Sequence, residues 1–320
     1  THGTPLLVSS GGTNTTDEAL TCYNQATTDP ENNKVTNIYN WYYDDVSLTS
    51  LLLPFDTRNE ITAKDYSGYN NHATINGAIW TTEGRVGGCY EFPASGGYIT
   101  VPHSSSLGGD GTWSEITIEL WIYFSQDQDG TRIIAKIPSY EIGFATGYTN
   151  RIYAGVWTEN GYRSSVSSGG YLLSKNTWYH IVMIYKDGEG ISLYVNGVLR
   201  QSRSWSGTIQ ASAGTRPETR RPLYIGWFDF YKGKIDEVRI YPKALSPEQI
   251  TQRYTETRYG LSNSSTITPQ ETKGGVWECQ VTPNDGFSDG QAKFSNTVVI
   301  ATSPPTASNL RFPLRTREQF

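Results

Sequence analysis

The chain has 320 residues, 18% of them charged and 13% aromatic, with a formal net charge of -5 at pH 7. This length leaves room for two domains with separate cores. The many Gly and Tyr residues, and the recurring short runs of Val, Ile and Trp, favour an all-β fold. The acidic balance speaks against nucleic acid as a partner, and no apolar run reaches the roughly 18 residues of a membrane span.

The first 45 residues predict three short strands separated by polar turns. The strands cover residues 5–9, a segment around Cys22, and residues 37–43, which include Trp41. A cysteine followed by a tryptophan on the third strand is typical of an immunoglobulin-like sandwich, where the tryptophan packs on a disulfide. Cys279 lies in a similar strand context and predicts a Cys22–Cys279 disulfide. A domain of about 100 residues cannot hold so long a gap, so an insertion is predicted between the two halves.

Within the insertion, residues 116–124 predict a strand with one apolar face. Isoleucine, leucine and phenylalanine alternate there with Thr117, Glu119, Trp121 and Tyr123, which predicts a half-buried sheet. The sequence Val195-Asn-Gly-Val198 predicts a two-residue hairpin of type I′, because Asn-Gly tolerates positive φ angles.

One helix is predicted, at about residues 247–256, near the end of the insertion. Ser246 is suited to cap it, Pro247 suits its first position, and Gln249 completes the sequence pattern of a capping box. We expect this helix to lead the chain back to the outer sandwich.

Residues 233–245 predict a strand that carries a carboxylate on its inward face. Alternation places Asp236 on one side with Val238 and Ile240. A buried charge needs a partner, and the turn Asp65-Tyr-Ser-Gly68 supplies a second carboxylate. Two carboxylates close together predict a bound cation.

The motifs of the insertion resemble a known family when they are taken together. They are Asp65-Tyr-Ser-Gly68 with Asn71, Gly87-Gly-Cys-Tyr-Glu-Phe92, Trp178-Tyr-His180, Leu193-Tyr-Val-Asn-Gly197, Ile235-Asp-Glu-Val-Arg-Ile-Tyr241 and Ala244-Leu-Ser246. In order and spacing this set resembles the laminin-G-like branch of the concanavalin A-like lectin and glucanase superfamily. The resemblance implies a jelly-roll sandwich over residues 46–258. It also implies a structural Ca²⁺ held by Asp65, Ser67, Gly68 and Asp236.

The segments on either side resemble the immunoglobulin-like repeats of prokaryotic surface proteins. The resemblance rests on Thr28-Asp-Pro-Glu-Asn32, Asn40-Trp-Tyr42, the segment 276–286 and Ser303-Pro-Pro-Thr-Ala307. It implies a sandwich made of residues 1–45 and 259–302, into which the jelly roll is inserted, followed by a linker or donated strand at 303–320.

Catalytic chemistry is not predicted. Glycan-cleaving enzymes of this superfamily place two or three acidic residues on alternate positions of one strand, and the nearest candidates are Glu115 and Glu119, which we interpret as solvated strand residues. The four histidines match no metalloenzyme spacing, and His180 is interpreted as a structural histidine. Cys89 is the cysteine left over, and we expect it to be a buried free thiol.

Aromatic residues gather just before the Asp236 strand, in residues 227–231. We expect Tyr153, Trp157, Tyr162 and Trp205 on neighbouring loops or strands. Exposed rings stack well on sugars or on a protein partner, so Trp205, Trp227 and Tyr231 are the candidate ligand-binding residues. The alternative for each of them is ordinary packing.

These observations predict a non-catalytic lectin-like adhesion module on an immunoglobulin-like scaffold, extracellular and at the cell surface. The chain begins at Thr1 rather than Met, as a processed or excised segment would. Its expected partner is a glycan or a cell-surface protein. Asn14 and Asn263 lie in sequons for N-glycosylation.

Two other functions stay open at this point. The first is a structural subunit of a surface filament or layer, which self-assembles when residues 308–320 donate a strand to a neighbour. The second is a polysaccharide-degrading enzyme.

Overall fold

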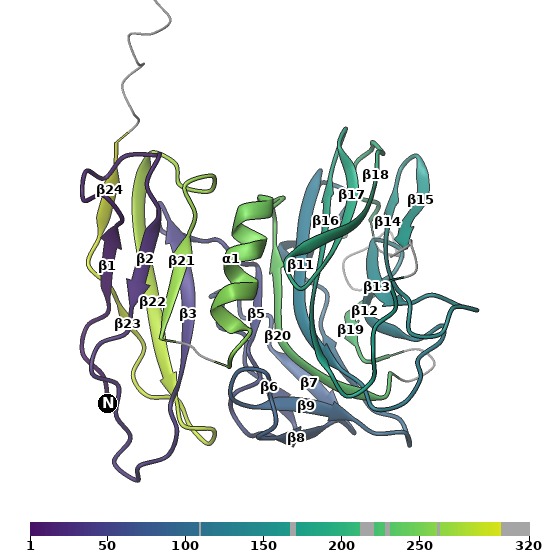
Figure 1. Ribbon diagram of the computed structural model, residues 1–320, viewed down its shortest axis with the longest axis horizontal. Helices are drawn as coiled ribbons and strands as arrows, with labels where there is room; N and C mark the ends of the chain where they lie inside the picture. The colour runs from purple at the N-terminus through teal and green to yellow at the C-terminus, as the bar shows by residue number, and fades with distance from the viewer. Residues whose placement is uncertain (109, 167–170, 212–220, 228–230, 261–262, 302–320) are drawn as a thin grey trace, which may run out of the picture.

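The computed structural model describes residues 1–108, 110–166, 171–211, 221–227, 231–260 and 263–301. Two β-sandwiches stand side by side, with the helix α1 (Pro247–Thr257) between them (Figure 1). We call them the terminal sandwich, which holds the first and last described strands, and the central sandwich. Nearly all regular structure is strand, which confirms the all-β fold with one α-helix in the described part of the chain.

The terminal sandwich is built from both ends of the chain. Its three-stranded sheet has the order β1 (Leu6–Ser9), β2 (Leu20–Tyr23), β21 (Ser264–Ile267). Its five-stranded sheet has the order β23 (Lys293–Phe294), β22 (Gly275–Asn284), β3 (Thr36–Tyr43), β4 (Val46–Ser47), with β24 (Val298–Ile300) also paired to β22. The strands predicted at both ends of the chain are therefore present and pair with each other. Their assignment to the immunoglobulin-like class stays a prediction.

The central sandwich consists of two eight-stranded sheets. The sheet farther from the terminal sandwich, here the outer sheet, has the order β15 (Gly161–Val166), β14 (Ile152–Thr158), β13 (Tyr140–Phe144), β12 (Arg132–Lys136), β19 (Leu223–Ile225), β10 (Tyr98–Val101), β7 (Ala73–Asn76), β6 (Thr62–Ala63). The inner sheet has the order β18 (Val198–Arg203), β17 (Gly190–Val195), β16 (Trp178–Lys186), β11 (Glu115–Tyr123), β20 (Gly233–Tyr241), β9 (Cys89–Phe92), β8 (Ile79–Thr81), with β5 (Leu51–Leu53) beside β20. A short 3₁₀ helix (Ser105–Leu107) follows β10.

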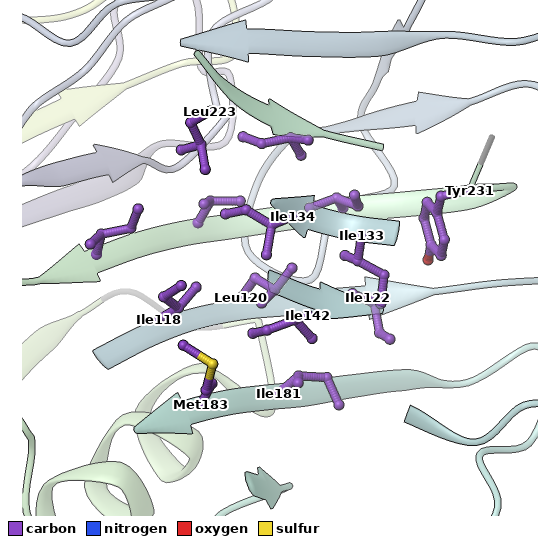
Figure 2. Packing of buried hydrophobic residues seen from close by; sticks show 14 of the residues in the cluster. Ile118, Leu120, Ile122, Ile133, Ile134, Ile142, Ile181, Met183, Leu223 and Tyr231 are labelled. Atoms are coloured by element: carbon purple, nitrogen blue, oxygen red, sulfur yellow. The ribbon is translucent and has the colours of Figure 1, made fainter. Parts of the chain in front are cut away.

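A large apolar core lies between the inner and outer sheets. Figure 2 shows Ile118, Leu120 and Ile122 of β11 packed toward Ile134 of β12 and Ile142 of β13, and all five side chains are fully buried. Alternation along β11 therefore predicted its core-facing residues correctly. A second, smaller core fills the terminal sandwich around Trp41 and Trp277.

The other face of β11 is buried as well, which corrects the expectation of a half-buried sheet. Thr117, Glu119 and Trp121 have at most 1% of their surface exposed. The cause is α1, which lies against this face: the Trp121 indole N–H donates to Thr257 Oγ1 at 3.0 Å. We call this outward side of the inner sheet the covered face.

A β-bulge changes the direction of Asp236. In the pairing of β20 with β11, Arg239 lies opposite Glu119 and Asp236 opposite Trp121, so two residues of β20 oppose one of β11. Glu237 has a φ of 52° at this point. Strict alternation through β20 was therefore a wrong prediction: Asp236 does not share the face of Val238 but lies on the covered face with Trp121.

The predicted helix is present, and Ser246 Oγ accepts the N–H of Gln249 at 3.2 Å. Gln249 does not complete a capping box. Its side chain instead donates to Thr266 O at 2.9 Å and accepts from Thr268 N at 2.8 Å, which joins the helix to the segment containing β21. The predicted hairpin is confirmed, with φ angles of 54° at Asn196 and 75° at Gly197.

The predicted disulfide joins Cys22 to Cys279, with 6.3 Å between the two Cα atoms, and Cys89 is a free, fully buried thiol. Burial raises the pKa of Cys89 far above its ordinary value, with a smaller contribution from Asp236, so the thiol stays protonated. No helix in the described part of the chain is long and apolar enough to cross a membrane.

Candidate functional site

The Asp65 carboxylate organises its own turn. Its Oδ1 accepts the N–H groups of Leu52 and Ser67, each at 2.9 Å. Its Oδ2 accepts from Ser67 Oγ at 2.6 Å and from Asn71 N at 2.9 Å. Gly68 has a φ of 88°, which suits the tight turn. The motif that predicted a cation ligand thus holds a set of hydrogen bonds that ties the turn to β5.

Asp236 has different neighbours. Its Oδ2 accepts Val86 N at 2.9 Å, and its Oδ1 accepts Glu237 N at 2.7 Å. Burial raises the pKa of Asp236 well above its ordinary value, and the charges of Glu237 and Asp56 raise it further. The described residues contain no group of three or more His, Cys, Asp or Glu side chains able to hold a metal ion. Asp65 and Asp236 thus each accept backbone N–H groups of different segments, and the Ca²⁺ between them stays a prediction.

The covered face carries a buried charged network centred on Glu119. Its carboxylate accepts from His180 Nε2 at 3.1 Å, Arg253 Nε at 3.2 Å and the Tyr241 hydroxyl at 3.1 Å. Arg253 also bonds Glu256 at 3.0 Å. Burial alone would raise the pKa of Glu119, but Arg253 and His180 hold it well below its ordinary value.

This network is closed to ligands. The space left between the two sandwiches beside Arg239 and Arg253 has a volume of only about 20 Å³, enough for about one water molecule. Glu119 is buried and paired, so describing it as a solvated strand residue was wrong. Glu115 also has a structural partner, because its Oε2 accepts Ala244 N at 2.9 Å.

Two of the three candidate aromatic residues serve packing. Tyr231 is fully buried in the central core (Figure 2), and its hydroxyl donates to Tyr123 O at 2.7 Å, so it presents no ring to a ligand. Trp205 packs against the same core, and its indole N–H donates to Thr158 Oγ1 at 3.0 Å. Residues 228–230 of the aromatic segment lie outside the described part of the chain.

Trp227 belongs to a row of aromatic rings on the outer sheet. Its ring stacks on Tyr224 with 4.1 Å between centroids and an interplanar angle of 21°. Tyr224 in turn lies 6.3 Å from Tyr98, centroid to centroid. All three rings are half-buried, so part of each remains accessible.

Strand register extends this row across the outer sheet. Tyr224 is opposite Ala135, Ala135 is opposite Glu141, and Glu141 is opposite Gly155. Paired residues point to the same side of a sheet, so these residues share the face of Tyr224. The buried Glu141 carboxylate is ion-paired with Arg132, whose side chain is 22% exposed.

Gly155 lies between two further aromatic residues, Tyr153 and Trp157, that share its face because they are two positions away along β14. Both rings are half-buried. We call the side formed by Tyr98, Tyr153, Trp157, Tyr224 and Trp227 the aromatic face. It is turned away from α1 and the terminal sandwich (Figure 1).

Sequence reasoning named Trp227 as a candidate and placed Tyr153 and Trp157 among its possible neighbours, but it missed Tyr98 and Tyr224. A signal for Tyr153 and Trp157 is their spacing in Tyr153-Ala-Gly-Val-Trp157, in which two aromatic rings flank a glycine on one face of a strand. Tyr98 and Tyr224 are single tyrosines in separate short strands, and the sequence does not tell that these strands are neighbours.

The predicted glycosylation sites are not tested by the geometry. Asn263 is exposed, whereas Ser265, the third residue of its sequon, is buried in β21. Asn14 is half-buried in a loop, with a φ of 56°. The tail proposed to donate a strand lies in residues 302–320, outside the described part of the chain.

Residues 93–251 match the family model described as the concanavalin A-like lectin/glucanases superfamily. This is the superfamily that the motifs of the central sandwich resemble. A search of the curated proteins finds no sequence that matches the chain.

Solved structures with a similar fold include three binding domains. The binding domain of Paraclostridial mosquitocidal protein 1 has a TM-score of 0.53 at 16% identity, covering 67% of this chain and 55% of that one. The receptor-binding domain of botulinum neurotoxin C/D mosaic serotype has a TM-score of 0.52 at 16% identity, covering 74% and 71%. The binding domain of botulinum neurotoxin DC in complex with SialylT has a TM-score of 0.51 at 15% identity, covering 66% and 52%. The chain thus spans about half the length of two of them, and these likenesses concern the fold alone.

Proposed function

We propose that this protein is a carbohydrate-binding module, because residues 93–251 match the family model of the concanavalin A-like lectin/glucanases superfamily. The proposed site is the aromatic face of the outer sheet. The observation that carries the proposal is the row formed by the stacked rings of Trp227 and Tyr224 and the neighbouring ring of Tyr98, on the side of the sandwich turned away from α1.

The chemistry of this face suits a sugar chain. Flat rings pack against the apolar faces of pyranose units at little entropic cost. The Arg132 guanidinium, ion-paired with the buried Glu141 and 22% exposed, supplies donors for hydroxyl groups. The rings come from β10, β14, β19 and the turn after β19, and a row spread across several strands fits an extended oligosaccharide better than a compact ligand.

We propose further that the module is extracellular and does not cleave its ligand. Glycoside hydrolysis uses two carboxylates on either side of the scissile bond. Among the described strand residues of the aromatic face we find one carboxylate, Glu141, and it is ion-paired with Arg132. A disulfide between Cys22 and Cys279 is compatible with an oxidising compartment. Adhesion to a cell-surface glycan is the role that combines these features.

A glycan array with the full chain tests the proposal, followed by titration of the best oligosaccharide into the variants Trp227→Ala and Tyr224→Ala. We expect affinity to fall by about tenfold or more in each variant, because buried aromatic anchors dominate binding energy. Tyr69→Ala is the matched control, since Tyr69 is an exposed ring (41%) of a different region. Absence of binding on the array, or equal loss in the control, contradicts the proposal.

A further inference from the structure

A second cavity lies where the two sandwiches meet, away from the aromatic face. Its volume is about 250 Å³. The terminal sandwich contributes Thr36 at the start of β3 and Phe287 in the loop after β22, and the central sandwich contributes Asp56, Trp80 and the loop at Gly87 and Gly88. We call it the junction cleft.

The cleft contains a buried acceptor without a partner. Asp56 is 2% exposed, and its Oδ1 accepts Gly88 N at 3.2 Å. Its other oxygen, Oδ2, has no hydrogen-bond partner. A buried carboxyl oxygen without a partner is costly, so the site fits a ligand that brings a hydroxyl group. Burial also raises the pKa of Asp56, as do the nearby charges of Glu237 and Asp289.

Glycines bring the polar groups of the cleft together. A Cβ on Gly87 would lie 1.9 Å from Asp56 Oδ1 and 2.7 Å from Thr36 Oγ1, and the φ of Gly87 is +65°. A Cβ on Gly88 would lie 2.6 Å from Cζ2 of Trp80. These two glycines therefore allow the loop to approach a carboxyl group, a hydroxyl group and an indole ring at once.

Two aromatic rings supply the apolar part of the cleft. Trp80 is half-buried, and its orientation is fixed because its indole N–H donates to Phe55 O at 2.8 Å. Phe287 is 62% exposed. The loop that carries Phe287 is held in place, since Gly286 O accepts Arg58 N at 2.9 Å and Asn284 Nδ2 donates to Thr57 Oγ1 at 2.6 Å. A cleft fixed in this way can bind a ligand without the free-energy cost of ordering a loop.

We propose that the junction cleft is a second binding site, and that it takes one sugar residue, free or at the end of a glycan. A sugar ring combines an apolar face, which fits Trp80 and Phe287, with hydroxyl groups, which fit Asp56 and Thr36. An anionic ligand is disfavoured, because Lys34 is opposed in the lining by Asp285. The size of the cleft suits a single residue, whereas the aromatic face suits a chain.

Ligand-observed saturation-transfer NMR with the full chain tests this inference. The probes are D-glucose, D-galactose, D-mannose and N-acetyl-D-glucosamine, each added to the Trp227→Ala variant so that the aromatic face does not contribute. We expect saturation transfer to at least one sugar, and an affinity about fivefold or more weaker when Phe287→Ala is added. Thr36→Val, which replaces a hydroxyl with a methyl group of similar size, should lower the affinity for the same sugar.

Tyr148→Ala is the matched control, because Tyr148 is an exposed ring (54%) that does not line the cleft. Phe287 is exposed, so its replacement leaves the fold intact and the test does not depend on Asp56 variants. No transfer to any of the four sugars overturns the proposal, as does binding that Phe287→Ala and Thr36→Val leave unchanged. The two sites fail independently, since oligosaccharide binding lost in Trp227→Ala concerns the aromatic face alone.

Discussion

The two outward sides of the central sandwich carry similar residues and serve different purposes. The covered face has Trp121, Tyr241 and the ion-paired Glu119, and the aromatic face has Trp227, Tyr224 and the ion-paired Glu141. They differ in what lies over them. Helix α1 and the terminal sandwich lie on the first, whereas the second is turned away from both (Figure 1).

This difference shows that residue type alone does not identify a binding site. On the covered face the polar groups bind one another, and the space left is about 20 Å³. On the aromatic face half-buried rings keep accessible area. A buried carboxylate paired with arginine thus lies beneath α1 in one place, and in the other it lies beneath a candidate sugar site with its arginine partly exposed.

The largest expected effect is on the covered face. Glu119→Ala should lower the free energy of unfolding by about 3–5 kcal/mol, because it leaves Arg253 buried without its main partner. Urea denaturation measures this. Glu141→Ala is the matched change on the aromatic face, and it should cost less because Arg132 is 22% exposed. Equal losses would contradict the distinction between the two faces.

Acid should lower the stability of the fold through Glu119. The pKa of Glu119 is lower in the folded chain than its ordinary value of 4.5, so its charge stabilises the fold above about pH 4.5, and that contribution is lost as the pH falls further. Between about pH 5 and pH 3, Glu119→Gln should therefore lose less stability than the wild type. Asp56 and Asp236 have raised pKa values, so their protonation favours the folded chain as the pH falls. Both residues are present in the wild type and in the variant, so the difference in stability between the two proteins reports on Glu119 alone.

Asp236→Asn should stabilise the chain at pH 7 by about 1 kcal/mol. The pKa of Asp236 is raised in the fold, so its charge is unfavourable at neutral pH; the amide keeps an oxygen for Val86 N, while its NH2 group faces Glu237 N, which keeps the gain small. A bound Ca²⁺ would reverse this result. Melting temperatures of both proteins with calcium and with a chelator decide the matter: a wild-type melting temperature that falls on chelation would establish the predicted ion.

The smallest expected effect on stability is at Trp227. Because its ring is half-buried on the aromatic face, Trp227→Ala should change the free energy of unfolding by only about 0.5 kcal/mol. Trp121→Ala, on the covered face, should cost about 3–5 kcal/mol. If Trp227→Ala is as destabilising as Trp121→Ala, the aromatic face is a packing surface and not a binding site.

The sequence predicted the features that depend on local chemistry. Alternation identified the core-facing residues of β11. Asn196-Gly197 specified the turn between β17 and β18, and Ser246 and Pro247 marked the start of α1. The strand contexts of Cys22 and Cys279 predicted their disulfide. In each case the side chain or φ preference of one or two residues determines the structure.

The sequence did not predict features that arise from distant packing. Nothing around Glu119 indicates that a helix about 130 residues later will cover it. Glutamate has no preference for positive φ, so the bulge at Glu237, which turns Asp236 to the other face, has no signal. Tyr231 was grouped with Trp227 because the two are close in sequence. In the fold, however, the Tyr231 hydroxyl donates to Tyr123 O at the end of β11, and the ring points into the core.

The disulfide determines how the chain would carry mechanical tension. Cys22 and Cys279 are covalently joined across 257 positions, and the whole central sandwich lies within that loop. A pull applied at residues 1 and 301 would pass through the bond and load only the short stretches outside it. The central sandwich, with its aromatic face, would therefore keep its shape under a force that unravels the strands around it. After reduction the same pull would reach every strand, and the accessible extension would grow by roughly 3.4 Å for each residue released.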